Sequence, residues 1–198
     1  MRSAIQHLKK DAVLAKIVKA VGPYRMEYGA PKFENLVRSI VYQQLHGRAA
    51  AVIYGRLREA VGEEELSPTG ILRLRPDRMR KLGLSAQKTI YIRELAKHTR
   101  RGSVVFESLP EMDDATVISH LTQVKGIGVW TAHMFLIFSL RRPDVLATGD
   151  LAIRMAIKQA YGLDDLPKPA EMERIAAGWR PWASVACWYL WRSLDTAR

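Results

Sequence analysis

Between Val124 and Asp150 the chain reads VKGIGVWTAHMFLIFSLRRPDVLATGD, and this stretch holds two candidate chemical features. The first is a turn with Gly126 and Gly128 directly before an apolar run. Glycine allows tight turns and the close approach of a ligand to main-chain N–H groups. The first N–H groups of the following helix lack internal partners and carry the positive end of its dipole. The turn is therefore a candidate phosphate site, although helix–helix turns also use glycine for packing alone.

The second feature is Asp150, which immediately precedes LAIRMAIKQAYG, a segment with helical periodicity. Alone, such an aspartate is most simply a helix N-cap. The cap position is compatible with catalysis, because a helix N-terminus favours an ionised carboxylate. A fixed anion can also stabilise positive charge that develops in a transition state. Asp144, in RRPD, is interpreted as a turn residue.

Helices must position both features, because apolar residues recur at helical spacing through most of the chain. A core-facing stripe runs from Phe33 to Val41 and ends at QQLHG. Ser85 is predicted to cap the helix AQKTIYIRELAKHT, and Asp113 or Asp114 to begin the helix before the glycine turn. The inward-facing residues of the first of these two helices are predicted to be Ile90, Leu95 and Ala96.

Both ends of the chain are also predicted to be helical. Residues 1–23 fit one amphipathic helix rather than a signal peptide, because lysines interrupt the apolar positions. In the tail, Pro169 and Pro181 suit the first turns of two helices and Gly178 the stop between them. No segment alternates as a strand does, and none approaches the roughly 20 apolar residues of a membrane helix. The expected fold class is all-α, with roughly nine or ten short helices.

Composition narrows the partners and the cofactors. The 198 residues include 31 Lys and Arg against 20 Asp and Glu, a formal net charge of +11. This balance favours polyanions, meaning nucleic acid or an anionic membrane surface. The single cysteine, Cys187, excludes a disulfide within the chain and a cysteine-held zinc site or iron–sulfur cluster.

Five segments together carry a resemblance to a known family: FENLVRSIVYQQLHGRAA, LGLSAQKTIYIRELA, LTQVKGIGVWTAHMF, RRPDVLATGDLAIR and GWRPWASVACWYLW. In their order they resemble the helix-hairpin-helix (HhH-GPD) DNA glycosylase superfamily, from about residue 33 to 191. The last segment resembles the alkylpurine (3-methyladenine) glycosylases of the AlkA type, or DNA glycosylase II. Since the first family-like helix begins by about residue 33, the chain looks like a compact form without the N-terminal β-domain of some members.

The resemblance implies that the hairpin binds DNA phosphates and a cation. The N–H donors would belong to Gly126 and Gly128, with the Thr131 hydroxyl assisting. The implied cation is monovalent and structural, Na⁺ or K⁺. Its ligands would be the backbone carbonyls of Thr122, Val124 and Ile127.

The resemblance also makes Asp150 the catalytic residue. Members that cut the DNA strand through a Schiff base have a lysine two residues after the second hairpin glycine, where this chain has Trp130. The implied enzyme is therefore monofunctional: it hydrolyses the base–sugar bond and leaves an abasic site. An electron-rich aromatic face suits a cationic alkylated purine. The implied base pocket is Trp130, Met134 and Trp191, with Met134 replacing an aromatic residue.

The remaining tryptophans have a simpler interpretation. Trp179 and Trp182 are assigned to core packing, and Trp188 is left open between the core and the pocket.

A flipped base leaves a gap in the stack that a wedge must fill. The family places this wedge in the loop read here as QQLHG. Either Gln44 hydrogen-bonds the orphan base or the apolar Leu45 takes its place; alternatively, both only end a helix. His46 either contacts phosphate or caps the next helix.

The combined prediction is one glycosylase unit over residues 1–198 with two helical lobes and a DNA cleft between them. Lobe A covers about 33–142, including the hairpin 117–140; lobe B covers about 1–32 and 143–198. The expected partner of this base excision repair enzyme is double-stranded DNA with damaged bases such as 3-methyladenine and 7-methylguanine. No membrane, no catalytic cofactor and a monomer are expected. The location would be the nucleoid in a prokaryote or the nucleus in a eukaryote.

Three alternatives are weighed against this prediction. The first is a non-catalytic helix-hairpin-helix DNA-binding module. The second is a glycosylase for another lesion, such as ethenoadenine, hypoxanthine, 1-methyladenine or an oxidised base. The third, a basic protein of membrane surfaces, rests on charge alone.

Overall fold

The structure is a computed structural model that describes residues 1–45, 47–62, 64 and 66–196. Within these residues it has twelve α-helices, two 3₁₀ helices and no strand, so the predicted all-α class is confirmed. The chain forms two units. Unit 1 comprises residues 1–28 and 136–198, and unit 2 residues 29–135. These boundaries lie a few residues before the expected ones at 32 and 142.

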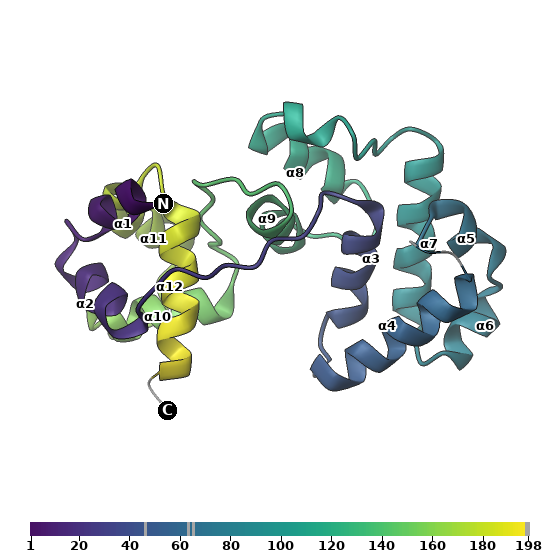
Figure 1. Ribbon diagram of the computed structural model, residues 1–198, viewed down its shortest axis with the longest axis horizontal. Coiled ribbons are helices and arrows are strands. Elements are labelled where there is room, and N and C mark those ends of the chain that lie inside the picture. Colours follow the sequence, from purple (N-terminus) through teal and green to yellow (C-terminus); the bar gives the residue numbers. More distant parts are fainter. Residues whose placement is uncertain (46, 63, 65, 197–198) are drawn as a thin grey trace. The chain divides into compact units, whose positions relative to one another are not determined.

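Each unit has its own set of helices, labelled in Figure 1. Those of unit 1 are α1 (Arg2–Leu8), α2 (Ala12–Val21), α10 (Leu151–Tyr161), α11 (Pro169–Ala176), the 3₁₀ turn Ala177–Trp179 and α12 (Ala183–Thr196). Those of unit 2 are α3 (Phe33–Tyr42), α4 (Gly47–Val61), α5 (Pro68–Arg73), α6 (Pro76–Lys81), α7 (Ala86–Arg100), the 3₁₀ turn Leu109–Glu111 and α8 (Asp114–Thr122). Helix α9 (Val129–Phe138) begins in unit 2 and ends in unit 1.

Helix α7 is the central element of unit 2, where it packs against α3, α5 and α6 (Figure 1). The predicted stripe of α3 is buried throughout. Ser85 caps α7, accepting a hydrogen bond from the Lys88 N–H, as predicted. Ile90 does not face inward: it is 48% exposed, because the buried positions of α7 follow the spacing 89, 92 and 95–96.

The N-terminal segment of unit 1 forms two helices rather than the single predicted one. Asp11 interrupts it, because its Oδ1 accepts the N–H groups of Val13 at 2.8 Å and Leu14 at 3.0 Å and so caps α2. Its Oδ2 accepts from the Tyr161 hydroxyl at 2.7 Å and the Trp179 indole at 3.3 Å. Burial acts to raise the pKa of Asp11, but these hydrogen bonds outweigh it and lower the pKa.

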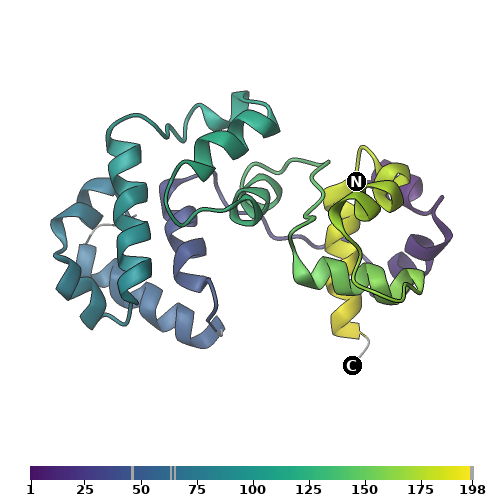
Figure 2. The same ribbon diagram turned by 180° about the vertical axis from the view of Figure 1, so that it is seen from behind.

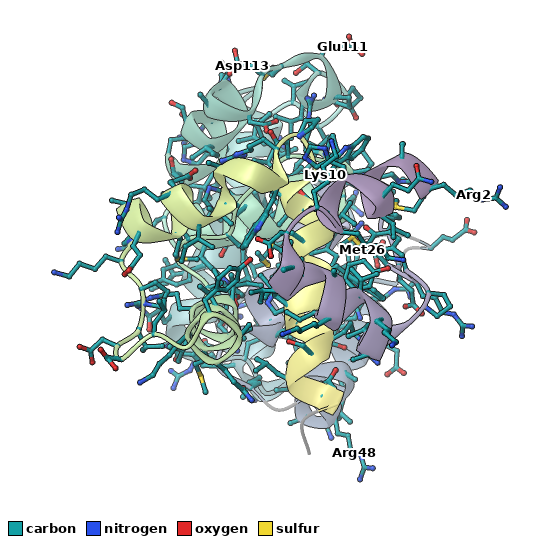
Figure 3. All side chains as sticks on the ribbon, turned by 90° about the vertical axis from the view of Figure 1, so that its left-hand side faces the viewer. Arg2, Lys10, Met26, Arg48, Glu111 and Asp113 are labelled. Atoms are coloured by element: carbon teal, nitrogen blue, oxygen red, sulfur yellow. The ribbon has the colours of Figure 1, made fainter. Side chains whose placement is uncertain are left out.

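Helix α12 is the central element of unit 1 and packs against α2 and α10. Figure 2 shows α12, in yellow, beside α10, in green. In Figure 3, which views the molecule from the left-hand side of Figure 1, the side chain of Arg2 on α1 points away from these helices. No helix among the described residues is long and apolar enough to cross a membrane.

Candidate DNA-binding and catalytic residues

The glycine turn lies where the sequence predicts it, between the end of α8 at Thr122 and the start of α9 at Val129. Its two glycines have different roles. Gly126 has a φ of +96°, and a Cβ there would lie 2.1 Å from the Tyr91 ring. A Cβ on Gly128 would meet nothing within 4 Å. Gly126 is therefore required by the fold, whereas Gly128 keeps an open approach to the backbone.

The N–H groups of this turn are available to a ligand. Ile127 donates to the Val124 carbonyl at 3.0 Å, and the first helical bond runs from Ala132 to Gly128. The N–H groups of Gly126 and Gly128 donate to no acceptor in the described part of the chain. Gly128 is exposed. The turn thus offers unpaired donors at a helix N-terminus, which is the arrangement that binds anions.

Thr131 does not lie where a hydroxyl could assist a phosphate at the surface. Its side chain is 3% exposed, and its Oγ1 is 3.5 Å from the Gln43 amide nitrogen. The same Gln43 nitrogen donates to the Gly126 carbonyl at 3.3 Å. The expected phosphate contact of the Thr131 hydroxyl is therefore corrected: the hydroxyl takes part in the connection between the hairpin and the end of α3.

The loop at the end of α3 presents both wedge candidates to solvent. Gln44 is exposed and has a φ of +54°, a conformation that non-glycine residues seldom adopt. Leu45 is 39% exposed, which is notable for an apolar side chain in a structured loop. His46 lies outside the described residues.

Asp150 is both an N-cap and a nearly buried carboxylate, at 8% exposure. Its Oδ1 accepts the Ile153 N–H at 2.9 Å, which starts α10, and the Trp191 indole N–H at 3.0 Å. The predicted cap is confirmed. The two donors hold the carboxylate in one orientation inside unit 1, at the positive end of the helix dipole.

Trp191 is thus brought together with Asp150, although the resemblance places it in the base pocket. Its ring stacks on Phe138 at 5.6 Å between centroids and 27° between planes. With one ring face covered and its N–H on the carboxylate, Trp191 positions Asp150. The structure therefore adds a role that the resemblance did not imply.

The loop that leads to Asp150 is tied to the start of α12. The buried Ser184 hydroxyl donates to the Arg142 carbonyl at 2.7 Å and accepts the Val145 N–H at 2.9 Å. Asp144 accepts the Ala183 N–H at 3.1 Å and pairs with Arg180 at 3.2 Å. The interpretation of Asp144 as a turn residue is consistent with these contacts, which anchor the turn to α12.

The other two base-pocket candidates, Trp130 and Met134, lie in unit 2. They are one turn apart on α9 and so share a face of that helix. Trp130 is 42% exposed, and Met134 is half-buried. An indole that is exposed at a helix start can offer its solvent-facing surface to a ligand ring.

The remaining tryptophans belong to the packing of unit 1. Trp179 is fully buried, as predicted, while Trp182 is only half-buried. Trp188 is 8% exposed and packs against Tyr24 at 4.7 Å and Tyr189 at 4.9 Å. These contacts decide the open question on Trp188 in favour of the core.

Cys187 is also part of this core. Burial raises the pKa of its thiol to about 12, and it is not available as a thiolate near neutral pH. Among the described residues no group of three or more His, Cys, Asp or Glu side chains could hold a metal ion.

Sequence reasoning missed three contributors: Phe138 behind Trp191, Ser184 under the loop, and Lys88, which holds the end of α3. Each acts on a segment remote in sequence, so no local pattern could reveal it. The repeated Arg-Pro pairs in RRPD and WRPW mark the two segments that Ser184 joins, but they do not predict the contact.

Comparison with known proteins now identifies the family. Residues 37–181 match the family described as HhH-GPD superfamily base excision DNA repair protein. The chain belongs to this superfamily. DNA-3-methyladenine glycosylase 1 of Schizosaccharomyces pombe is 34% identical to it over 188 residues, which cover 92% of this chain and 82% of that protein.

Two solved structures agree with the fold. The 3-methyladenine DNA glycosylase of Schizosaccharomyces pombe in complex with abasic DNA superposes with a TM-score of 0.85 at 34% identity. The aligned region covers 96% of this chain and 95% of that one. The DNA-3-methyladenine glycosidase from Bacillus halodurans gives 0.83 at 36% identity, covering 93% and 85%.

Proposed function

We propose that this HhH-GPD protein is a monofunctional DNA glycosylase of base excision repair that removes alkylated purines. The observation that carries the proposal is Asp150, a nearly buried carboxylate held by the Ile153 and Trp191 N–H groups at the start of α10. The relatives named DNA-3-methyladenine glycosylase support the substrate class.

The chemistry assigned to Asp150 is electrostatic. As the bond between base and deoxyribose breaks, positive charge develops on the sugar, and a fixed anion lowers the energy of that transition state. The carboxylate needs no reorganisation, because its hydrogen bonds already orient it. Asp150 also orients the water that attacks the sugar carbon, so that the products are a free base and an abasic site.

Two features favour a cationic purine and hydrolysis without strand cleavage. Trp130 presents an exposed indole at the start of α9, and an indole face attracts a cationic ring by stacking and cation–π interaction. The same residue occupies the position at which strand-cutting members have lysine, so no amine is supplied there for a Schiff base. The proposed substrates are 3-methyladenine and 7-methylguanine, which carry positive charge.

Duplex DNA binds unit 2 through backbone phosphates in this proposal. The N–H groups of Gly126 and Gly128 supply one contact. A second basic surface lies on α5 and α6, where five cationic side chains occur in residues 73–81 against the single acid Asp77. Four of them are exposed and form no ion pair with an acidic side chain of the described residues: Arg75, Arg78, Arg80 and Lys81. Unpaired cations at this density suit a phosphate backbone.

A structural Na⁺ or K⁺ fits the carbonyl groups at the end of α8. Neutral carbonyl oxygens without a carboxylate are suitable ligands for a monovalent cation. The Val124 carbonyl accepts the Ile127 N–H and has a second lone pair for the ion. The Thr122 and Ile127 carbonyls complete the proposed set. Such an ion would stiffen the turn and add positive charge beneath the phosphate.

The wedge is assigned to the exposed pair Gln44 and Leu45 at the end of α3. Leu45 can fill the gap left by the flipped base, and the Gln44 amide can hydrogen-bond the orphan base. The proposed active form is a monomer.

The test is release of free base from methylated duplex DNA by wild type and Asp150→Asn, with strands checked before and after alkali. We expect the wild type to free methylpurines, Asp150→Asn to free them far more slowly, and strands to break only after alkali. If neither protein frees a base while both bind DNA, the proposal is wrong and a binding module or another lesion replaces it. Strand breaks before alkali would contradict the monofunctional assignment.

A further inference from the structure

Lys88 on α7 holds the end of α3. Its Nζ donates to the Val41 carbonyl at 2.7 Å and to the Gln43 carbonyl at 2.6 Å, although these residues lie more than forty positions earlier in the sequence. Both distances are short, as expected for hydrogen bonds from a charged donor. Burial lowers the pKa of Lys88, so placing the ammonium here has a cost. The two hydrogen bonds from the ammonium act against that cost.

The loop that it orders is strained. Gln44, the residue directly after the Gln43 carbonyl, adopts a φ of +54°. A non-glycine residue in the left-handed backbone region persists only where its surroundings enforce it, and such outliers gather at functional positions. Leu45 follows at 39% exposure. Lys88 thus fixes the backbone from which both wedge candidates project.

The same helix also contacts the hairpin. Tyr91, one turn after Lys88 on α7, lies against Gly126, where even a Cβ would collide with its ring. From the loop side, the Gln43 amide reaches the Gly126 carbonyl at 3.3 Å. The loop, the start of α7 and the hairpin surround a cavity of about 470 Å³ within unit 2. Its lining includes Gln44, Lys88 and Gly128.

We propose that Lys88 is a positioning residue for base extrusion: through α7 it holds the Gln44–Leu45 wedge at a set place relative to the phosphate-binding hairpin. The proposal rests on the proposed function, because it concerns how the same enzyme opens the duplex. In this proposal Lys88 acts through the loop and not by contact with the base or the sugar. When the hairpin binds a phosphate, the wedge is already aligned with the base stack, so DNA binding and insertion act together.

A purely structural lysine would behave differently from a positioning one. Removing a structural interaction lowers stability and slows the excision of every substrate alike. Removing a positioning interaction slows excision most where extrusion is hardest, and it spares substrates in which no base pair must be opened. The comparison of a paired lesion with an unpaired one therefore separates the two roles.

The experiment compares Lys88→Met with Lys97→Met, a matched control on the same helix. Lys97 forms an ion pair with Glu94, so both variants remove one positive charge but only Lys88→Met releases the two loop carbonyls. Excision of a single 7-methylguanine is measured with enzyme in excess, once opposite cytosine and once opposite an abasic site. We expect Lys88→Met to be slower by about tenfold or more on the paired lesion and by less than about threefold on the unpaired one.

Two further measurements make the interpretation specific. In an Asp150→Asn background, 2-aminopurine beside the lesion reports unstacking; Lys88→Met should reduce the fluorescence rise, while Lys97→Met should not. Lys88→Arg, which keeps a cation beside the two carbonyls, should restore part of the excision rate.

The outcomes are distinct. Equal slowing of both lesions with a lowered melting temperature would assign Lys88 to fold stability alone and overturn the proposal, as would an unchanged rate on the paired lesion. If the wild type frees no base from either duplex, the proposed function itself fails, and the positioning role falls with it. That result differs from the others because it appears before any variant is made.

Discussion

The hydrogen bond from Trp191 to Asp150 gives the most direct test of the assigned chemistry. Trp191→Phe removes the indole N–H at 3.0 Å from Oδ1 and keeps an aromatic ring beside Phe138. The carboxylate then retains the backbone N–H of Ile153, which donates to it at 2.9 Å. The change therefore loosens Asp150 without removing it.

The magnitude follows from the kind of bond removed. A hydrogen bond to a charged group contributes about 1.5–3 kcal/mol. If that ordering is needed in the transition state, base release slows by about tenfold to a hundredfold, since about 1.4 kcal/mol corresponds to a factor of ten. Affinity for undamaged duplex should stay within about twofold, because the hydrogen bond lies inside unit 1 and the proposed phosphate donors all belong to unit 2.

The assay is single-turnover release of 7-methylguanine from duplex DNA, with Trp182→Phe as a matched control on the half-buried tryptophan near the start of α12. A double-mutant cycle makes the test sharper. If Trp191 acts through Asp150, the effect of Trp191→Phe disappears in an Asp150→Asn background. A full rate in Trp191→Phe, or an equal loss in both backgrounds, would show that Trp191 does not act by holding the carboxylate.

Three further predictions concern the hairpin, the basic surface and Asp11. Gly126→Ala should lower the free energy of unfolding, measured by urea titration, by at least about 1 kcal/mol. The reason is that residue 126 has a φ of +96° and that the added Cβ would enter the Tyr91 ring. The control Gly128→Ala should leave the free energy of unfolding within about 0.5 kcal/mol of the wild type. Replacing the four cations of residues 75–81 by glutamine should make the plot of log affinity against log salt concentration less steep. The slope should change by about 0.9 for each phosphate that the variant no longer neutralises. Replacing the four lysines of residues 9–19 should change that slope less, and equal changes would refute the assigned surface. The pKa of Asp11 in the folded chain lies below its ordinary value of 3.8. Its hydrogen bonds therefore stabilise the fold fully above that pH and lose this effect as the pH falls through the folded pKa. Asp11→Asn should lower stability more at pH 7 than near pH 3, and an equal loss at both pH values would contradict this.

Local signals predicted the helix starts well. Ser85, Asp113 and Asp150 each cap the helix that follows, as expected. An N-cap side chain bonds to a backbone group two or three residues away, so the sequence alone contains both partners. The buried stripe of α3 could also be predicted from the sequence, because its apolar residues have the spacing of one helix face.

The wrong expectations share a cause. Residues 1–23 have continuous helical periodicity, which hides the N-cap that Asp11 forms through Oδ1. The Tyr161 and Trp179 donors, remote in sequence, hold its other oxygen and fix the break between the two helices. Ile90 has an apolar side chain but lies off the buried face of α7. The place of Thr131 just after the turn suggests a phosphate contact, yet packing buries its hydroxyl against Gln43. In each case the neighbour that decides the outcome comes from another element.

By itself the sequence determined the all-α class, the helix caps, the glycine turn and Asp150 at the start of α10, because these depend on neighbours along the chain. Only the tertiary structure decided that Trp191 donates to Asp150, forty-one residues away, and that Lys88 holds the carbonyls of Val41 and Gln43. Those contacts form when separate helices pack. Their energy depends on distances that no sequence spacing sets, which is why the groups that orient the candidate site became visible only in the folded chain.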